Sequence, residues 1–307
     1  MRAADSGELE LGLLFAAGHS GVDDELEVRV AVVQDVAVEG DVADLGVADR
    51  LAVFAVAGDC SFAPESREAG IALDRALGPP VALVTGANKG IGLETVRRLT
   101  AARYRTYLAA RNIELGQAAA DAVGAQFLQL DVTSEDSVRR AADVVGQAEG
   151  RLDVLVNNAG ISGPVCDARD YTADDAAEVF LTNVVGYVRV IHAFLPLLEA
   201  SEHPRIVNVS SGLGSFGRFH DDARIESRFG SPLCGAAKAA VNMLTARFAR
   251  LLPDIRINAA DPGMTATDLS RGEGHSIHDG TDAIVAYALE TDGPTGTFRD
   301  RDGEVPW

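Results

Sequence analysis

From residue 81 onward, short apolar runs alternate with longer amphipathic stretches. The first run, "VALVT" at residues 81–85, is apolar up to its last position, which is typical of a strand buried on both faces. A glycine-rich turn follows, and then "GLETVRRLTAARY" at residues 92–104 has apolar residues at helical spacing. Strands that alternate with helices of this length predict a doubly wound, parallel α/β sheet covered by helices on both faces.

The same alternation continues to the end of the chain. The predicted strands lie at residues 81–85, 105–111, 125–132, 151–160, 205–211, 255–261 and 295–300. The predicted helices lie at residues 92–104, 112–124, 134–150, 173–200 and 234–252, with one more before the last strand. Such sheets bind ligands at the carboxyl ends of their strands, so we expect functional residues there.

Residues 1–80 differ in composition from the rest of the chain. They contain no Lys, Asn, Thr, Tyr or Trp, and 16 acidic against 5 basic residues contribute −11 of the formal net charge of −19. They show no helix cap, hairpin signal or chemical motif, and we expect no secretory signal there. Three interpretations stay open: a disordered or loosely packed extension, a small unrecognised module, or upstream DNA translated from a misplaced start codon. We favour an acidic Ala/Val-rich extension without its own function, followed by one main domain at residues 81–307.

Charge and composition restrict the partners. A net charge of −19 argues against nucleic acid, and no uninterrupted apolar run of about 18 residues predicts a membrane span. Cys60, Cys166 and Cys234 have no C-x-x-C spacing, so neither a disulfide framework nor a thiolate metal site is expected. We predict a cytoplasmic protein with a small-molecule partner and no bound metal.

The glycine-rich turn carries the first chemical motif. Gly86, Gly90 and Gly92 in "TGANKGIG" lie between a strand and a helix, where backbone can approach a pyrophosphate and the helix N-terminus can hold its charge. The alternative is an ordinary strand-to-helix turn. Together with "NNAG" at residues 157–160, the motif resembles the short-chain dehydrogenase/reductase family over residues 81–307, which implies a Rossmann-type fold.

The resemblance implies a dinucleotide site and its preference. Lys89 precedes the second glycine and Arg111 follows the second strand, where two cations suit a 2′-phosphate, so NADPH and the carbonyl-reductase branch are expected. Solvated surface cations are the alternative. "LDVT" matches the family's adenine contacts, and "PGMTAT" matches its nicotinamide loop. The predicted NADP(H)-binding residues are Gly86, Asn88, Lys89, Gly90, Ile91, Gly92, Arg111, Asp131, Val132, Asn158, Ala159, Gly160, Lys238, Pro262, Gly263 and Thr267.

The same resemblance supplies candidate catalytic residues. Reduction of a carbonyl generates an alkoxide, so the site needs an acid and hydrogen-bond donors to the oxygen. Asn183 matches the family's Asn, which anchors a helix and a proton-relay water, and Ser211 matches the donor to the substrate oxygen. Lys238 matches the Lys that binds the nicotinamide ribose and lowers the pKa of a tyrosine. The alternatives are an amide at a helix kink, a loop serine and a solvated lysine.

At the position of that tyrosine stands Cys234. No other tyrosine lies between Ser211 and Lys238, since the five are Tyr104, Tyr107, Tyr171, Tyr187 and Tyr287. We expect Lys238 to lower the pKa of the thiol, but the thiol ends several ångströms short of a phenol oxygen, so turnover should be slow by roughly 10²–10⁴-fold unless a water fills the gap. A small buried hydrophobe and a thioester-forming nucleophile are the alternatives for Cys234.

The 22 residues between Ser211 and Cys234 form a long insertion. Similar insertions occur in monomeric carbonyl reductases, so we expect a monomer, with a homodimer as the alternative. Phe216, Phe219 and Phe229 either line an apolar substrate pocket or pack the insertion onto the domain. The sequence thus predicts an NADPH-dependent reductase of a ketone, aldehyde or quinone, impaired at Cys234. The alternative is an NADP(H)-binding protein without turnover.

Overall fold

The computed structural model of this chain describes residues 13–16, 29–32 and 78–307. The chain divides into two compact units, residues 1–71 and 72–307. In the first unit, β1 (Leu13–Ala16) pairs antiparallel with β2 (Arg29–Val32). The other residues of the predicted extension at 1–80, up to residue 77, lie outside the described residues, so its interpretations stay predictions.

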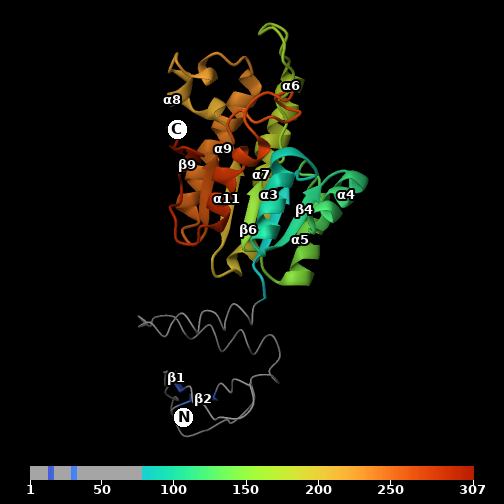
Figure 1. The fold of residues 1–307 in the computed structure, drawn as a ribbon, viewed down its shortest axis with the longest axis vertical. Helices are drawn as coiled ribbons and strands as arrows, with labels where there is room; N and C mark the ends of the chain where they lie inside the picture. Colours follow the sequence, from blue (N-terminus) through green and yellow to red (C-terminus); the bar gives the residue numbers. More distant parts are fainter. Residues whose placement is uncertain (1–12, 17–28, 33–77) are drawn as a thin grey trace, which may run out of the picture. The chain divides into compact units, whose positions relative to one another are not determined.

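The second unit contains an eight-stranded sheet with helices on both faces (Figure 1). The strand order is β10-β9-β8-β7-β6-β3-β4-β5, and all neighbours are parallel except β10, which pairs antiparallel with β9. The strands are β3 (Val81–Thr85), β4 (Arg105–Ala110), β5 (Gln126–Gln129), β6 (Val154–Asn157), β7 (Arg205–Val209), β8 (Arg256–Ala260), β9 (Phe298–Asp300) and β10 (Gly303–Glu304). The predicted doubly wound, Rossmann-type fold is confirmed.

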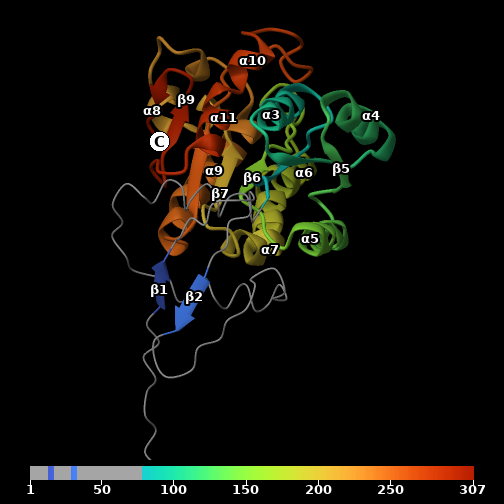
Figure 2. The ribbon, with the colours of Figure 1, turned by 60° about the horizontal axis from the view of Figure 1, so that its bottom comes forward.

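The helices that cover the sheet follow the predicted pattern closely (Figure 2). The longer ones are α3 (Gly90–Ala101), α4 (Ile113–Val123), α5 (Glu135–Glu149), α6 (Ala173–Phe180), α7 (Gly186–Glu199), α9 (Pro232–Leu251) and α11 (Asp282–Leu289). The short ones are η2 (Leu181–Val185), η3 (Gly212–Gly214), α8 (Phe216–Phe219), η4 (Ile225–Ser227) and α10 (Ile277–Gly280).

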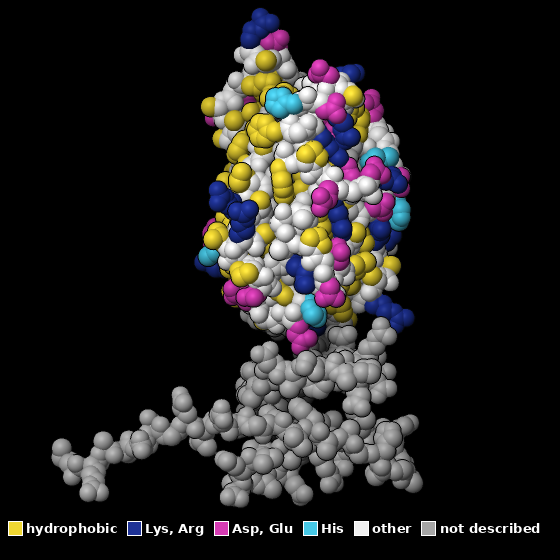
Figure 3. Space-filling view, turned by 90° about the vertical axis from the view of Figure 1, so that its left-hand side faces the viewer, with side chains coloured by type: hydrophobic (Ala, Val, Ile, Leu, Met, Phe, Trp, Pro, Cys, Tyr) yellow, Lys and Arg dark blue, Asp and Glu magenta, His cyan; other side chains and the backbone are white. Residues whose placement is uncertain are grey.

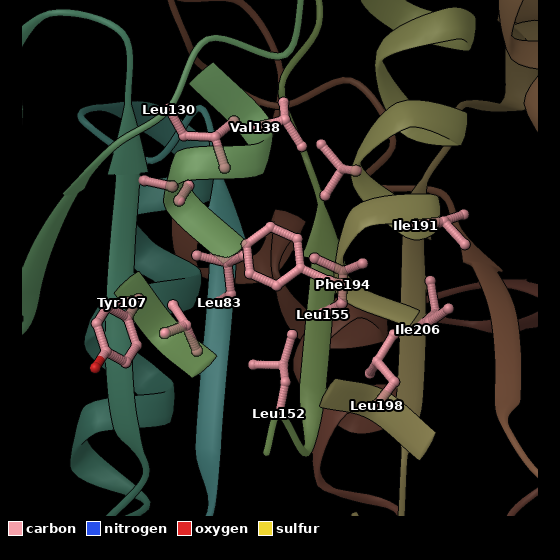
Figure 4. Close-up of a cluster of buried hydrophobic side chains, with 14 of the residues drawn as sticks. Leu83, Tyr107, Leu130, Val138, Leu152, Leu155, Ile191, Phe194, Leu198 and Ile206 are labelled. Atoms are coloured by element: carbon pink, nitrogen blue, oxygen red, sulfur yellow. The ribbon is translucent and has the colours of Figure 1, made fainter. Parts of the chain in front are cut away.

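Alternate residues of the central strands enter two separate cores. Leu83 and Leu155 face the core that α5 and α7 cover, while Val84 and Val156 face the core that α3 and α11 cover. Figure 4 shows Phe194 of α7 directed toward the strands in the first of these cores. Because strand side chains alternate between faces, apolar residues at every position require helices on both sides.

The helix predicted at residues 173–200 is continuous but changes its winding. Its middle, η2, is a π-helical segment between α6 and α7. By length and composition alone, Ala173–Glu199 is the one helix in the described part of the chain that could cross a membrane. Polar residues interrupt it, so a search for uninterrupted apolar runs does not detect it. Val190, Phe194 and Leu198 of this helix are fully buried in the first core.

Candidate active site

The glycine-rich turn after β3 and the "NNAG" loop after β6 interlock. The Asn158 side-chain amide donates to the carbonyl oxygens of Thr85 (2.8 Å) and Gly86 (3.1 Å). In return, Thr85 Oγ1 accepts from the backbone nitrogens of Asn158 (3.0 Å) and Ala159 (3.1 Å). The strand order reverses between β3 and β6, so these contacts lie at the crevice where such sheets bind ligands.

Each glycine of the turn has its own structural reason. Gly86 has φ +62°, and a Cβ there would lie 2.8 Å from the Ala159 Cα. A Cβ on Gly92 would lie 2.5 Å from Asn158 Nδ2, so this glycine permits close packing against the neighbouring loop. Gly90 has φ +59° and opens α3, and a Cβ there would contact only the Thr267 side chain, at 3.5 Å.

The start of α3 is suited to an anion. Among the described residues, no side chain caps its N-terminus, and its first turn contains no acidic residue. The free N–H groups of this turn, which include those of the predicted residues Gly90 and Ile91, therefore carry the positive end of the helix dipole. Asn88 lies half-buried in the turn before them. This uncapped terminus fits a pyrophosphate.

Lys89 and Arg111 lie near the same turn. The Ala87 nitrogen donates to the Ala109 oxygen at 3.0 Å. Lys89 lies two residues after Ala87, and Arg111 lies two residues after Ala109. Both side chains are exposed. Lys89 Nζ forms an ion pair with Asp268 Oδ2 at 2.6 Å, a partner on the predicted nicotinamide loop that sequence reasoning missed.

Asp131 and Val132 follow β5, at the same edge of the sheet. Asp131 Oδ1 accepts hydrogen bonds from the Thr133 nitrogen (2.9 Å) and hydroxyl (2.7 Å), which fixes the turn. Val132 is buried and closely approaches Gly186 at the start of α7, where a Cβ would lie 3.0 Å from its Cγ2. Hydrogen bonds hold the Asp131 turn, and packing against α7 holds Val132. One oxygen of Asp131 is hydrogen-bonded inside its own turn.

Asn183 is fully buried in η2, where its amide binds the backbone after β6. Its Nδ2 donates to the Ile161 oxygen and its Oδ1 accepts from the Ile161 nitrogen, both at 2.8 Å. Gly160 fits beneath it, because a Cβ there would lie 3.3 Å from Asn183 Oδ1. The Asn183 amide thus lies in a π-helical segment, and such segments are common at functional sites.

Ser211 lies two residues after the end of β7, and its turn packs on α9. Ser211 Oγ accepts from the Leu213 nitrogen at 3.2 Å, which leaves its hydrogen free to donate. A Cβ on Gly214 would lie 2.5 Å from the backbone carbon of Lys238, and one on Gly235 would lie 3.1 Å from the Leu213 oxygen. The serine turn thus touches the helix that carries Cys234 and Lys238.

The Lys238 ammonium is buried at the carboxyl end of β7. Its Nζ donates to the Val209 oxygen at 2.6 Å, and burial lowers its pKa, against the opposing charges of Cys234 and Asp261. One of its three hydrogens is thereby used, and the other two suit ribose hydroxyls.

Tyr187 is a neighbour of Lys238 that sequence reasoning missed. Its ring centroid lies 5.5 Å from Lys238 Nζ, within cation–π range, and its hydroxyl donates to the same Val209 oxygen at 3.1 Å. Burial raises the pKa of this phenol, and the charge of Cys234 adds to the effect. Tyr187 lies one helical turn after Asn183, and this spacing of four residues was the available signal.

The environment of Cys234 corrects one expectation. Lys238 does lower the pKa of the thiol, but desolvation by burial is larger and the net shift is upward. At neutral pH the thiol therefore keeps its proton, which suits an acid and disfavours a thiolate nucleophile.

The predicted nicotinamide loop begins where β8 ends. Gly263 has φ +63° beside His275, and Thr265 Oγ1 donates to the Pro262 oxygen at 2.9 Å. The Thr267 side chain lies over Gly90, so this loop and the glycine-rich turn approach each other across the crevice. The cradle of glycines, the uncapped helix and the buried ammonium together fit a dinucleotide.

The aromatic side chains of the insertion are exposed. Phe216, Phe219 and Phe229 are 67%, 53% and 49% exposed, so none of them is buried in the core of the domain, and none lines the cavity beside the insertion. A cavity of about 360 Å³ does lie between the insertion and Pro262–Met264, but charged side chains dominate its lining. Figure 3 shows hydrophobic side chains scattered among charged ones on the face that carries α8.

Two other features concern metal and sulfur chemistry. Within the described residues, no group of three or more His, Cys, Asp or Glu side chains is arranged so that it could hold a metal ion. Cys166 and Cys234 are free thiols, and Cys60 lies outside the described residues.

Known proteins are similar to this chain in sequence and in fold. A family model described as short chain dehydrogenase matches residues 80–277. The (+)-neomenthol dehydrogenase of Arabidopsis thaliana is 32% identical over an alignment of 286 residues, gaps included. The alignment covers 73% of this chain and 96% of that protein. The structure of salutaridine reductase from Papaver somniferum aligns with a TM-score of 0.64 and 28% identity, covering 71% of this chain and 99% of that one. An NADPH-bound carbonyl reductase from chicken fatty liver aligns with a TM-score of 0.66 and 26% identity, covering 75% and 99%.

Proposed function

This chain belongs to the short-chain dehydrogenase family and is an oxidoreductase, and from that premise we propose that it uses NADPH to reduce a ketone, aldehyde or quinone. Members of the family bind NAD(P) and act on small carbonyl compounds. The observation that carries the proposal is the placement of Lys238. Its buried ammonium lies at the end of a central strand, on the helix that packs against the Ser211 turn.

The preference for NADPH follows from charge. Lys89 and Arg111 are both cationic and exposed beside the uncapped start of α3, and no acidic residue occupies the first turn of that helix. A 2′-phosphate would compete with Asp268 for the Lys89 ammonium. The NADPH-bound chicken carbonyl reductase is one of the structural neighbours, which supports the same preference.

When bound, NADPH would supply a hydride. Lys238 would hold the nicotinamide ribose with its two free hydrogens, and the hydroxyl of Ser211 would donate to the carbonyl oxygen and stabilise the negative charge that develops there. Asn183 fixes the backbone of the "NNAG" loop against the crevice. Cys234 occupies the acid position, and its protonated thiol delivers a proton through a water because of its short reach.

A second function is favoured by the same cysteine. The thiol at position 234 reaches less far than a phenol would, which weakens proton delivery but leaves the cofactor residues in place. A protein that binds NADP(H) without turnover is therefore the alternative. In either case we propose a cytoplasmic monomer with no nucleic acid, membrane or metal partner.

Substitution at position 234 tests the proposal. We expect Cys234→Tyr to oxidise NADPH faster by about 10²-fold or more with a panel of ketones, aldehydes and quinones, because the phenol restores direct proton delivery. Cys166→Tyr is the matched control, since Cys166 is an exposed free thiol. NADPH depletion by absorbance at equal cofactor occupancy is the measurement. If neither the natural chain nor Cys234→Tyr turns over any carbonyl while both bind NADPH, the binding function replaces the reductase.

A further inference from the structure

A buried ionic cluster joins the insertion to the rest of the site. We call it the Arg218 cluster, and it consists of Arg218 and Glu226 from the insertion, Asp261 from the end of β8, and Asp300 from the end of β9. All four side chains are largely buried. The cluster brings together three segments that are far apart in the sequence.

Arg218 is the centre of the cluster. Its Nη1 donates to Asp261 Oδ2 at 2.7 Å and to Glu226 Oε1 at 3.1 Å, and its Nη2 donates to Asp300. Burial acts to lower the pKa of this guanidinium, but the hydrogen bond and charges of the three carboxylates outweigh it, and the pKa is raised. Arg218 therefore stays charged and holds three carboxylates that would otherwise repel one another.

The cluster adjoins both loops of the candidate site. A Cβ on Gly212, the residue after Ser211, would lie 2.4 Å from Glu226 Oε1 and 3.0 Å from Arg218 Nη1. On the other side, Asp261 Oδ1 accepts from the Gly263 nitrogen at 2.8 Å. One guanidinium thus connects the backbone beside the serine to the backbone of the predicted nicotinamide loop.

The position of Arg218 is itself fixed from outside the cluster. Ser215 Oγ accepts from the Arg218 nitrogen at 3.1 Å and donates to the Pro306 oxygen at 2.5 Å. The Gly217 nitrogen donates to the Trp307 oxygen at 3.2 Å. The C-terminal residues therefore hold the short helix α8 in place. This fixes the backbone from which the Arg218 side chain reaches the cluster.

We propose that Arg218 is a positioning residue, which sets the Ser211 turn and the Pro262–Gly263 loop at the separation that hydride transfer requires. This inference rests on the proposed function, because it assigns these two loops to the substrate carbonyl and the nicotinamide. Small displacements between reacting groups have large effects on rate, so a residue that touches neither ligand acts strongly through the two loops.

Three variants of the full-length protein test the role of Arg218. Arg218→Met removes the charge, Arg218→Lys keeps it but offers no planar fork for three carboxylates, and Arg105→Met is the matched control. Arg105 pairs with the buried carboxylate of Glu149 at 2.6 Å, and it lies at the start of β4, the opposite end of the sheet. The measurements are the Kd for NADPH by its fluorescence, kcat and KM for the best carbonyl, and the melting temperature.

We expect Arg218→Met to lower kcat for the carbonyl and to weaken NADPH binding, each by about tenfold or more, and to raise KM, with partial recovery in Arg218→Lys. Arg105→Met should lower the melting temperature yet change kcat and the Kd by less than about twofold. A lower melting temperature with unchanged kcat, Kd and KM in both Arg218 variants would mean a purely structural role and overturn the inference. Failure of the natural chain to bind NADPH would instead contradict the proposed function.

Discussion

At the scale of single residues, burial decides the electrostatics of the candidate acid. Lys238 and Cys234 have opposite charges when both are ionised, and each favours the charged form of the other. Desolvation is the larger effect on both, so the pKa of the thiol rises and the pKa of the ammonium falls. Sequence reasoning anticipated the attraction between these two residues and gave the burial of Cys234 only as an alternative, because burial depends on the elements that pack around them.

The pH dependence of alkylation tests the state of the thiol. Because the pKa of Cys234 is raised, its thiolate should appear only above the ordinary value, and the midpoint of its alkylation profile should exceed about pH 8.5. Peptide mapping after timed iodoacetamide treatment separates Cys234 from the other two cysteines. Accessibility changes the rate but not the midpoint, and the denatured protein supplies the reference profile. A midpoint at or below the denatured value would contradict this assignment.

At the scale of elements, the turn between β3 and α3 combines two constraints. Gly86 needs a positive φ, and it also lies too close to Ala159 for a side chain. The first constraint is local and can be read from the motif. The second arises because β6 is the spatial neighbour of β3, although the two strands are far apart in the sequence.

Two glycine substitutions separate these constraints. Gly86→Ala and Gly124→Ala both place alanine at positive φ, which costs about 1–2 kcal/mol, but only Gly86 has neighbours within 4 Å of the new Cβ. We expect a larger loss of unfolding free energy for Gly86→Ala in urea. Its Kd for NADPH should also rise by about tenfold, because the turn must shift away from the "NNAG" loop. Equal stability and equal Kd in the two variants would show that the contact with Ala159 is unimportant.

At the scale of the whole molecule, the described residues of the second unit form one sheet and its hydrophobic clusters. The eight-stranded sheet and the hydrophobic clusters are formed by residues 81–305. Its C-terminal end is held as well, since Trp307 stacks on Phe298 with ring centroids 5.5 Å apart. Trp307 is the single tryptophan of the chain, so its emission reports on the folding of this unit.

Removal of residues 1–77 tests the independence of this unit. We expect the shortened chain to melt within about 2 °C of the full-length protein, equivalent to less than about 1 kcal/mol, because both cores are intact. Circular dichroism and Trp307 emission give the melting temperature, and NADPH fluorescence gives the Kd. A decrease well beyond that range, or a weaker Kd, would assign residues 1–77 a role in stability or binding that their composition does not suggest.

The strands and helices were predictable because each depends on neighbouring residues. The run at residues 81–85 is β3 as predicted, and the helix predicted at 234–252 is α9 at 232–251, where Pro232 at its first position shifts the start by two residues. Other features were not predicted from the sequence. The Asn183 amide in the π-helical turn binds the Ile161 backbone, and this contact exists only once the fold brings the two segments together.

The sequence by itself determined the layered fold, the glycine-rich turn and the residue types available at the candidate site. These features follow from residue type and spacing along the chain. Tertiary structure alone decided that Tyr187 lies beside Lys238, that Lys89 pairs with Asp268, and that Arg218 connects two loops of the site. Such contacts join residues from separate elements, and their energies depend on burial and distance, which only the folded chain defines.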